Sequence, residues 1–306
     1  MAKNKNEETT SDGSRAIVKF HLSDFIIMFV LVILCATCVI PFWHVLVKSL
    51  SGNGAVMRKE VFFWPKEFTF EAYTKVFADK AMVHSMVYSV IVTLIFTLLG
   101  MIVCTCAAYP LSKKRLKGRG LFTFILMVPM YFSAGMIPAY LLMVNLKLID
   151  TMWVLILPLI YSPYNMLVMK TYFQSSIPDS LEESAFLDGA TNMRILWSII
   201  LPLSKPILAT LSLFYAVGRW NAYADCMYYI TKDNLRLIQY KLYLLVKGAE
   251  ESINTSLGDV GGATTVTTPE VLQAACIMFV TIPIIIIYPF LQKYFVKGAM
   301  VGAVKG

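Results

Sequence analysis

Charged residues are scarce in this chain of 306 residues. Lys, Arg, Asp and Glu together make up 15% of the sequence, whereas hydrophobic residues make up 58% and the mean hydropathy is +0.66. A soluble globular domain usually carries about a quarter charged residues. The scarcity excludes an ordinary soluble domain and indicates a chain that crosses a membrane several times.

The residues on which enzymes rely are few and scattered. The histidines are dispersed at positions 21, 44 and 84, and the sequence contains neither His-Glu-x-x-His nor Gly-x-Ser-x-Gly. It also lacks a Gly-x-x-x-x-Gly-Lys loop, which would hold the phosphates of a nucleotide. The pair Cys35-x-x-Cys38 has no second pair or histidine accompanying it, so we interpret it as packed apolar side chains. We therefore assign no catalytic residue and no metal ligand, and a membrane-embedded enzyme stays only as an alternative.

Carboxylates are missing from the interiors of the apolar segments. Every Asp and Glu lies outside those segments or at their edges. A transporter driven by a proton or sodium gradient normally needs carboxylates deep within its membrane spans. An ion-gradient-coupled secondary transporter is therefore a second alternative that the sequence disfavours.

Long apolar segments are what the sequence has in abundance. About 20 apolar residues suffice to cross a bilayer core as a helix. Pro129, Gly135 and Pro138 interrupt one segment, which is tolerated where neighbouring helices or water satisfy the freed backbone groups. We therefore predict an all-α membrane protein with six transmembrane helices. The predicted spans are residues 24–46, 86–112, 121–144, 152–172, 203–223 and 271–291.

Positive charge lies beside the spans. Five of the seven residues in 113–119 are Lys or Arg. Short loops rich in Lys and Arg stay on the cytoplasmic side of a membrane. The predicted orientation puts both termini in the cytoplasm. The net charge of +8 is then explained by membrane orientation, and we predict no nucleic-acid partner.

A polar segment, residues 177–206, separates the fourth and fifth predicted spans. Ser180-x-x-Glu183 predicts a capping box, in which the two side chains cap the start of a helix reciprocally. Gly189 permits a break, and Asn192 is a suitable start for a second short helix. We therefore predict a bent pair of helices held at the membrane surface.

The same segment resembles the EAA loop of ABC importer permeases. The resemblance lies in Glu183-Ser184-Ala185, Asp188-Gly189-Ala190 and Ile199-Ile200-Leu201-Pro202, with nine residues between Gly189 and Ile199 as in that family. Ser184 replaces the first Ala of the family pattern. The resemblance implies that Glu183 pairs with a basic residue of an ATPase, that Ala185 and Gly189 allow a close fit, and that Asp188 caps or pairs locally. The coupling residues expected from it are Glu182, Glu183, Ser184, Ala185, Asp188, Gly189 and Ala190.

The likeness covers nearly the whole chain from about Phe20. The outer segment with Trp64-Pro65 and Phe68-Thr69 resembles that of carbohydrate-uptake permeases of the MalG-like group. Residues 214–221 and the final Gly-Ala-Val-Lys-Gly resemble the LplC and YtcP subgroup, which is associated with oligosaccharides from complex glycans. The resemblance implies the type I ABC importer (MetI-like) fold. It also implies the permease subunit of an ATP-driven importer that moves oligosaccharides, delivered by an extracellular binding protein, across the cytoplasmic membrane.

The resemblance further implies a set of partners. A second homologous permease subunit would form a heterodimer with this chain, two ATPase subunits would dock on the coupling loops, and an extracellular sugar-binding lipoprotein would dock outside. ATP and Mg would be bound by the partner ATPase, so we expect no cofactor in this chain. Membrane lipid would surround a multi-pass protein of the bacterial cytoplasmic membrane.

The fifth predicted span ends in a cluster of aromatic and polar residues that we treat as a candidate translocation path. Aromatic rings stack naturally on sugar rings, but an interfacial aromatic belt with helix packing explains the same pattern. Arg219 stands out because ionisable residues within a span are functional candidates. It would bind an acidic sugar or, as we favour, pair with Asp225 or reach the outer interface. The candidate path residues are Tyr215, Arg219, Trp220, Asn221 and Tyr223.

The predicted organisation has four parts. Residues 1–23 form a cytoplasmic tail, and residues 24–84 form the first transmembrane helix and an outer loop. Residues 85–291 form an ABC type-1 transmembrane core of five helices, with the cytoplasmic coupling loop at 174–201. Residues 292–306 form a cytoplasmic C-terminal tail.

Overall fold

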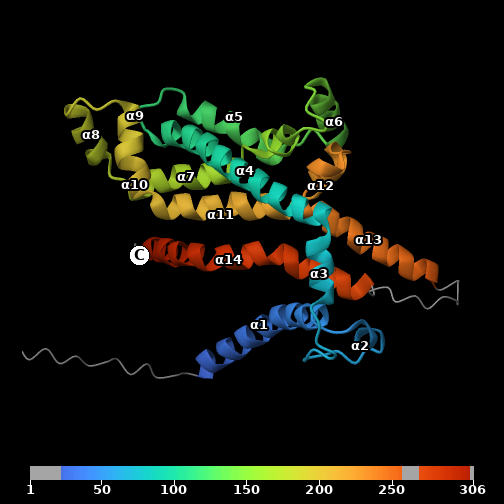
Figure 1. Ribbon diagram of the computed structural model, residues 1–306. Coiled ribbons are helices and arrows are strands. Elements are labelled where there is room, and N and C mark those ends of the chain that lie inside the picture. Colours follow the sequence, from blue (N-terminus) through green and yellow to red (C-terminus); the bar gives the residue numbers. More distant parts are fainter. Residues whose placement is uncertain (1–21, 257–268, 304–306) are drawn as a thin grey trace, which may run out of the picture. The chain divides into compact units, whose positions relative to one another are not determined.

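The computed structural model describes residues 22–256 and 269–303, and all regular structure within those ranges is helical (Figure 1). The chain divides into two compact units, residues 1–44 and 45–306. Helix α1 (Leu22–Ser49) supplies the described part of the first unit, and it is long and apolar enough to cross a membrane. The predicted tail at 1–23 lies outside the described residues, except for the start of α1.

The second unit consists of helices of very different lengths. Its α-helices are α2 (Asn53–Met57), α3 (Glu71–Ala78), α4 (Lys80–Ser112), α5 (Arg119–Tyr131), α6 (Met136–Asn145), α7 (Pro163–Ser176), α8 (Asp179–Leu187), α9 (Asn192–Ile195), α10 (Leu201–Leu203), α11 (Lys205–Asn221), α12 (Ala224–Tyr229), α13 (Ile238–Ser256) and α14 (Pro269–Ala303). Short 3₁₀ turns are η1 (Met152–Leu155), η2 (Leu157–Leu159) and η4 (Asp233–Leu235), and η3 (Leu196–Ile200) is a π-helical turn.

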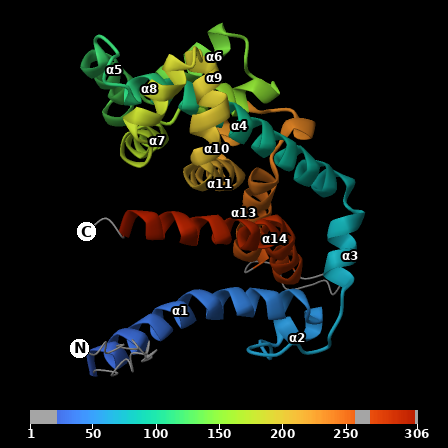
Figure 2. The same cartoon turned by 90° about the vertical axis from the view of Figure 1, so that its left-hand side faces the viewer.

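Helices α4, α7 and α11 lie side by side and form the centre of the second unit (Figure 1). Their facing side chains, including Phe96, Phe173 and Leu211, are buried. Within a membrane such packing is driven by close van der Waals contact, which small residues favour. Gly100 of α4 is such a residue, because a Cβ atom there would lie 2.7 Å from the ring of Tyr215 on α11. Helix α14 packs along α11 and α3 (Figure 2).

The described helices allow up to six membrane crossings, of which three are bent. Helices α1, α4 and α14 each contain a span long and apolar enough to cross alone. Three bent pairs reach that length only together: Arg119–Tyr131 with Met136–Asn145 at 111°, Met152–Leu159 with Pro163–Ser176 at 51°, and Asn192–Leu203 with Lys205–Asn221 at 84°. The third and fourth predicted spans are therefore broken helices, whereas the fifth is the continuous helix α11, with the bend at Ser204 near its start. Gly135, at φ +85°, supplies the sharpest bend.

Two predicted span ends are displaced for identifiable reasons. Helix α4 begins at Lys80, six residues before the predicted start, because the Asp79 carboxylate accepts hydrogen bonds from the backbone N–H groups of Ala81 and Met82. Such a cap extends a helix through a polar turn that hydropathy does not mark. Helix α14 continues to Ala303, so most of the segment predicted as a C-terminal tail is helical.

Candidate functional site

The coupling segment, defined here as α8 and α9 with the turn between them (residues 179–195), lies at one end of the group formed by α4, α7 and α11 (Figure 1). The predicted capping box at its start is wrong. Pro178 holds the N-cap position with an extended backbone (φ −62°, ψ 136°) and no side chain caps the helix. Because the helix begins at Asp179, Ser180 is its second residue and its hydroxyl is past the capping position.

The predicted break in the coupling segment is confirmed. Gly189 has φ +77°, and its N–H donates to the Phe186 carbonyl at 3.0 Å. The Ala190 N–H donates to the Ala185 carbonyl at 3.0 Å, which completes a Schellman motif. Asn192 is the first residue of α9, and the Thr191 hydroxyl caps that helix by accepting from the Arg194 N–H.

The seven predicted coupling residues divide by exposure. Glu183, Ser184, Asp188 and Gly189 are exposed, Ala190 is half-buried, and Ala185 and Glu182 are buried. The Glu182 carboxylate forms an ion pair with Lys113 of the loop after α4, and the two side chains are only 8% and 11% exposed. The structure thus turns Glu182 into the chain and presents Glu183 at the surface.

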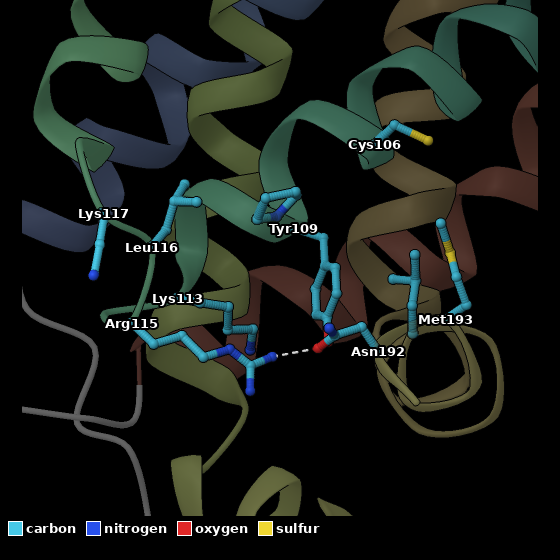
Figure 3. A pocket seen from close by; sticks show the side chains of 10 residues that line it. Cys106, Tyr109, Lys113, Arg115, Leu116, Lys117, Asn192 and Met193 are labelled. Carbon is cyan, nitrogen blue, oxygen red and sulfur yellow. Dashed lines mark hydrogen bonds between the residues drawn. The ribbon is translucent and has the colours of Figure 1, made fainter. Parts of the chain in front are cut away.

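Two further basic residues of that loop contact the coupling segment. Lys114 donates to the Asp179 carboxylate at 3.0 Å, and this hydrogen bond lowers the pKa of Asp179. Arg115 donates to the Asn192 side-chain oxygen at 2.5 Å. The Arg115–Asn192 contact lines one side of a cavity of about 440 Å³, in which Lys113, Arg115 and Tyr109 lie close to Asn192 (Figure 3). From the sequence, we interpreted the loop at 113–119 only as a signal of membrane orientation, and we did not predict its contacts with the coupling segment.

Arg219 lies at the other end of α11 and is fully buried. Its guanidinium donates to both carboxylate oxygens of Asp225, at 2.5 and 2.9 Å, and to the Leu155 carbonyl at 2.8 Å. Pairing with Asp225, one of the interpretations favoured from the sequence, is what the structure shows. The pair joins α11 to α12 and to η1.

The other candidate path residues point in different directions. Tyr215 is buried beside Gly100 and packs edge-on against Phe96, with ring centroids 5.7 Å apart. Trp220 is buried on the side of α11 that faces α14. Asn221 and Tyr223 line a cavity of about 720 Å³. The structure therefore brings together only the last two in that cavity.

The cavity lies at the end of the helix group opposite the coupling segment, between the α5–α6 bend, η1 and η2, and the start of α12. Tyr223 stacks on Tyr243, with centroids 4.9 Å apart and planes at 19°. Among the described residues that line the cavity none is Lys or Arg. Rings and short polar groups on one concave surface suit an uncharged, ring-shaped ligand. The aromatic and polar lining residues are Phe132, Ser133, Tyr161, Asn221, Tyr223, Asp225, Tyr228 and Tyr229.

Sequence reasoning missed four of the aromatic residues in this lining. Phe132 and Tyr161 come from segments distant in sequence from α11, and only the bent spans bring them to it. Tyr228 and Tyr229 follow Tyr223 closely. This cluster of aromatic residues could have been used to predict that they share the cavity lining with Tyr223. Within the described ranges, no three His, Cys, Asp or Glu side chains gather in a way that would hold a metal ion.

Comparison with known proteins gives one consistent result. Residues 100–301 match the family described as binding-protein-dependent transport system inner membrane component. The chain is 37% identical over 290 residues to the polygalacturonan/rhamnogalacturonan transport system permease protein YtcP of Bacillus subtilis (strain 168), covering 94% of this chain and 100% of that protein. It is also 37% identical over 274 residues to protein LplC of the same organism, covering 89% and 90%.

A solved structure extends the similarity to three dimensions. The crystal structure of a bacterial ABC transporter involved in the import of the acidic polysaccharide alginate contains a chain that matches with a TM-score of 0.80 and 33% identity. The match covers 90% of this chain and 99% of that chain. The MetI-like importer fold expected from the sequence is confirmed.

Proposed function

The chain belongs to the family of binding-protein-dependent transport system inner membrane components, and on this premise we propose that its cargo is an oligosaccharide. It is the permease subunit of an ABC importer in the inner membrane, a translocation subunit and not an enzyme. It works with an ATPase and with a substrate-binding protein. A membrane-embedded enzyme and an ion-gradient-driven carrier are thereby set aside.

The cavity of about 720 Å³ is the observation that carries the proposed cargo. Its aromatic rings would stack on the apolar faces of sugar rings, and Asn221 and Ser133 would hydrogen-bond to hydroxyl groups. Relatives named for polygalacturonan, rhamnogalacturonan and alginate transport support a saccharide cargo. Because Arg219 is buried in its pair with Asp225, this chain would recognise the rings and not the acid groups of such a saccharide.

The coupling segment supports the proposed attachment of the ATPase. Its exposed residues Glu183, Ser184, Asp188 and Gly189 would form the docking surface, with Glu183 pairing with a basic residue of the ATPase. Binding of ATP to the ATPase would favour one of two conformations of the permease, since a ligand shifts an equilibrium by its different affinities for the two states. ATP and Mg would be held by the ATPase and not by this chain.

The proposed assembly is completed by a second, homologous permease subunit. This chain would form a heterodimer with that subunit within membrane lipid, two ATPase subunits would dock on the cytoplasmic side, and the binding protein would be an extracellular lipoprotein. Both termini would be cytoplasmic, as the basic loop at 113–119 indicates. The coupling segment and that basic loop lie at the same end of the helix group, which is consistent with this orientation.

The experiment that tests the cargo is uptake into vesicles that contain the assembled importer. Labelled oligosaccharides, neutral and acidic, should enter only when ATP and the binding protein are both present. Uptake should persist after ionophores collapse the proton and sodium gradients. Binding and uptake of amino acids or peptides in place of oligosaccharides would overturn the proposed cargo.

A further inference from the structure

Three consecutive basic residues leave the end of α4, and each contacts a different part of the coupling segment. Lys113 pairs with Glu182, Lys114 pairs with Asp179, and Arg115 bonds to Asn192. The first two carboxylates lie on α8 and the amide lies on α9. The coupling segment is therefore attached to α4 by side chains, in addition to its chain connections to α7 and α11.

The Lys113–Glu182 pair is the most buried of these contacts. The Lys113 ammonium also lies over the ring of Tyr109, 5.0 Å from its centroid. Removing one member of such a pair would leave the other charge buried without compensation, so the two residues hold each other strongly in place. The Lys114–Asp179 pair, whose side chains are 85% and 65% exposed, contributes far less.

Arg115 spans the break between the two helices of the coupling segment. Its guanidinium lies over the Phe186 ring, 4.3 Å from the centroid, while it donates to Asn192. The bend at Gly189 is held by the two backbone hydrogen bonds of the Schellman motif, and nothing lies within 4 Å of the position that a Cβ atom of Gly189 would take. Arg115 therefore contacts both sides of the bend, Phe186 on α8 and Asn192 on α9.

Helix α4 is fastened at its other end as well. The Ser89 hydroxyl accepts from the Ile238 N–H at 2.8 Å, and His84 Nε2 lies 2.9 Å from the Asn234 carbonyl. With 33 residues, α4 is about 50 Å long. It thus connects the coupling segment with η4 and α13 at the opposite end of the helix group.

We propose that Lys113 and Glu182 are positioning residues that fasten the coupling segment to α4, so that movement of α8 is transmitted along α4 to the opposite end of the permease. This inference rests on the proposed docking of the ATPase on α8. It assigns Glu182 a role inside this chain, while Glu183 faces the ATPase.

The test compares variants of the full importer, reconstituted with its partner subunits and binding protein. In Lys113→Met and Glu182→Gln, the ATPase should remain attached and should still hydrolyse ATP. The amount of oligosaccharide transported per ATP should fall by at least about fivefold, within the usual range of coupling effects. Lys117→Met alters an exposed lysine of the same loop and should change that ratio less than about twofold.

Charge exchange keeps the test decisive if a single variant does not fold. The double variant Lys113→Glu/Glu182→Lys restores an ion pair and should recover both assembly and the transport ratio to within about threefold of the unmodified importer. Two results would overturn the inference: an assembled double variant that stays uncoupled, or detachment of the ATPase by Glu182→Gln. If instead Glu183→Lys leaves the ATPase attached, the proposed docking of the ATPase on α8 is wrong. That outcome is distinguishable from a failure of the present inference, which concerns only Lys113 and Glu182.

Discussion

The guanidinium of Arg219 holds the carboxylate of Asp225 through two hydrogen bonds at the end of α11. The Arg219 side chain has no exposed surface, and the Asp225 side chain is 11% exposed. Asp225 also lines the cavity of about 720 Å³, so the pair shapes the cavity wall while the positive charge itself lies behind it. Arg219 is consequently a structural support of the proposed sugar site.

Replacing Arg219 with Ala should impair the uptake of neutral and acidic oligosaccharides alike. Asp225 would be left buried without its partner, which costs about 3–5 kcal/mol when an ion pair is broken on one side. Thermal unfolding of the purified subunit would measure the loss of stability, and uptake of both classes of sugar would measure the loss of transport. Loss of uptake for acidic sugars alone would contradict the structural role, and unchanged uptake and stability would do so too. The double variant Arg219→Met/Asp225→Leu should recover most of the stability.

Tyr223 should contribute to sugar affinity through its ring. Tyr223→Ala should raise the sugar concentration needed for half-maximal uptake about tenfold, which corresponds to about 1.4 kcal/mol and to the value of one aromatic contact. Tyr223→Phe keeps the ring and should change that sugar concentration less than about threefold. Tyr131→Ala, at an exposed position on α5, is the matched control. Equal effects of the Ala and Phe variants would show that the hydroxyl, and not stacking, matters.

Reversing the charge of Glu183 should weaken attachment of the ATPase. The side chain is exposed on α8, so its replacement should leave the fold intact while like charges repel at the docking surface. Copurification of the ATPase with Glu183→Lys, compared with Glu71→Lys on α3, measures the effect. We expect at least about a tenfold weaker association for the first variant, since one partner of an interfacial charge pair is worth about 2 kcal/mol or more. Retained attachment would contradict the proposed role.

Hydropathy marked the apolar segments but could not show that the third and fourth are broken and that the fifth bends at its start. The 111° bend between α5 and α6 depends on Gly135 adopting φ +85°, which a glycine permits but does not require. The capping box failed for a similar reason: Ser180 and Glu183 have the right spacing, but the helix begins directly after Pro178. A glycine or a Ser-x-x-Glu spacing shows only which backbone conformations are allowed locally. Tertiary packing decides which of these conformations the chain adopts.

The site was predictable where its signal is local. Gly189 and the charged surface of α8 follow from a short stretch of sequence, and the structure shows the expected break there. Lys113 and Glu182 are 69 residues apart, and nothing in either neighbourhood indicates that they meet. The same holds for Phe132 and Tyr161 in the cavity wall. Contacts between distant segments depend on how the bent helices pack, which one sequence does not reveal.

Stability of the loops beyond α6 and α12 should depend on pH through Asp150. Its pKa is lowered, first by the hydrogen bond from the Thr231 hydroxyl and then by backbone N–H donors that include Lys232. A lowered pKa in the folded state means that the carboxylate stabilises the fold above the ordinary pKa of an aspartate. That contribution is lost as the pH falls through the lowered value.

Thermal unfolding of the purified importer between pH 7 and about pH 3 would measure this effect. Asp150→Asn should lower the unfolding temperature at neutral pH and should flatten its dependence on acid pH, because the titrating group is gone. Asp24→Asn is the control, since it removes an aspartate from α1, in the other compact unit. A pH profile that Asp150→Asn leaves unchanged would contradict the prediction.

Close approach of α4 and α11 should depend on the absence of a side chain at Gly100. A Cβ atom there would lie 2.7 Å from one atom of the Tyr215 ring and 2.9 Å from the next, so Gly100→Ala forces the ring or the helices to shift. Overpacking of this kind costs about 1–3 kcal/mol. We expect a lower unfolding temperature of the purified subunit and reduced transport.

The rescue follows from the same geometry. Gly100→Ala/Tyr215→Leu removes the ring that the new methyl group meets, so the double variant should be more stable than Gly100→Ala alone. Gly120→Ala is the matched control, because nothing lies within 4 Å of the position its Cβ would take and alanine favours a helix over glycine. Unfolding of the unmodified chain, Gly100→Ala, Tyr215→Leu and the double variant, measured in the same lipid discs, gives the interaction between the two positions directly. Purely additive effects would mean that the helices do not meet through this pair.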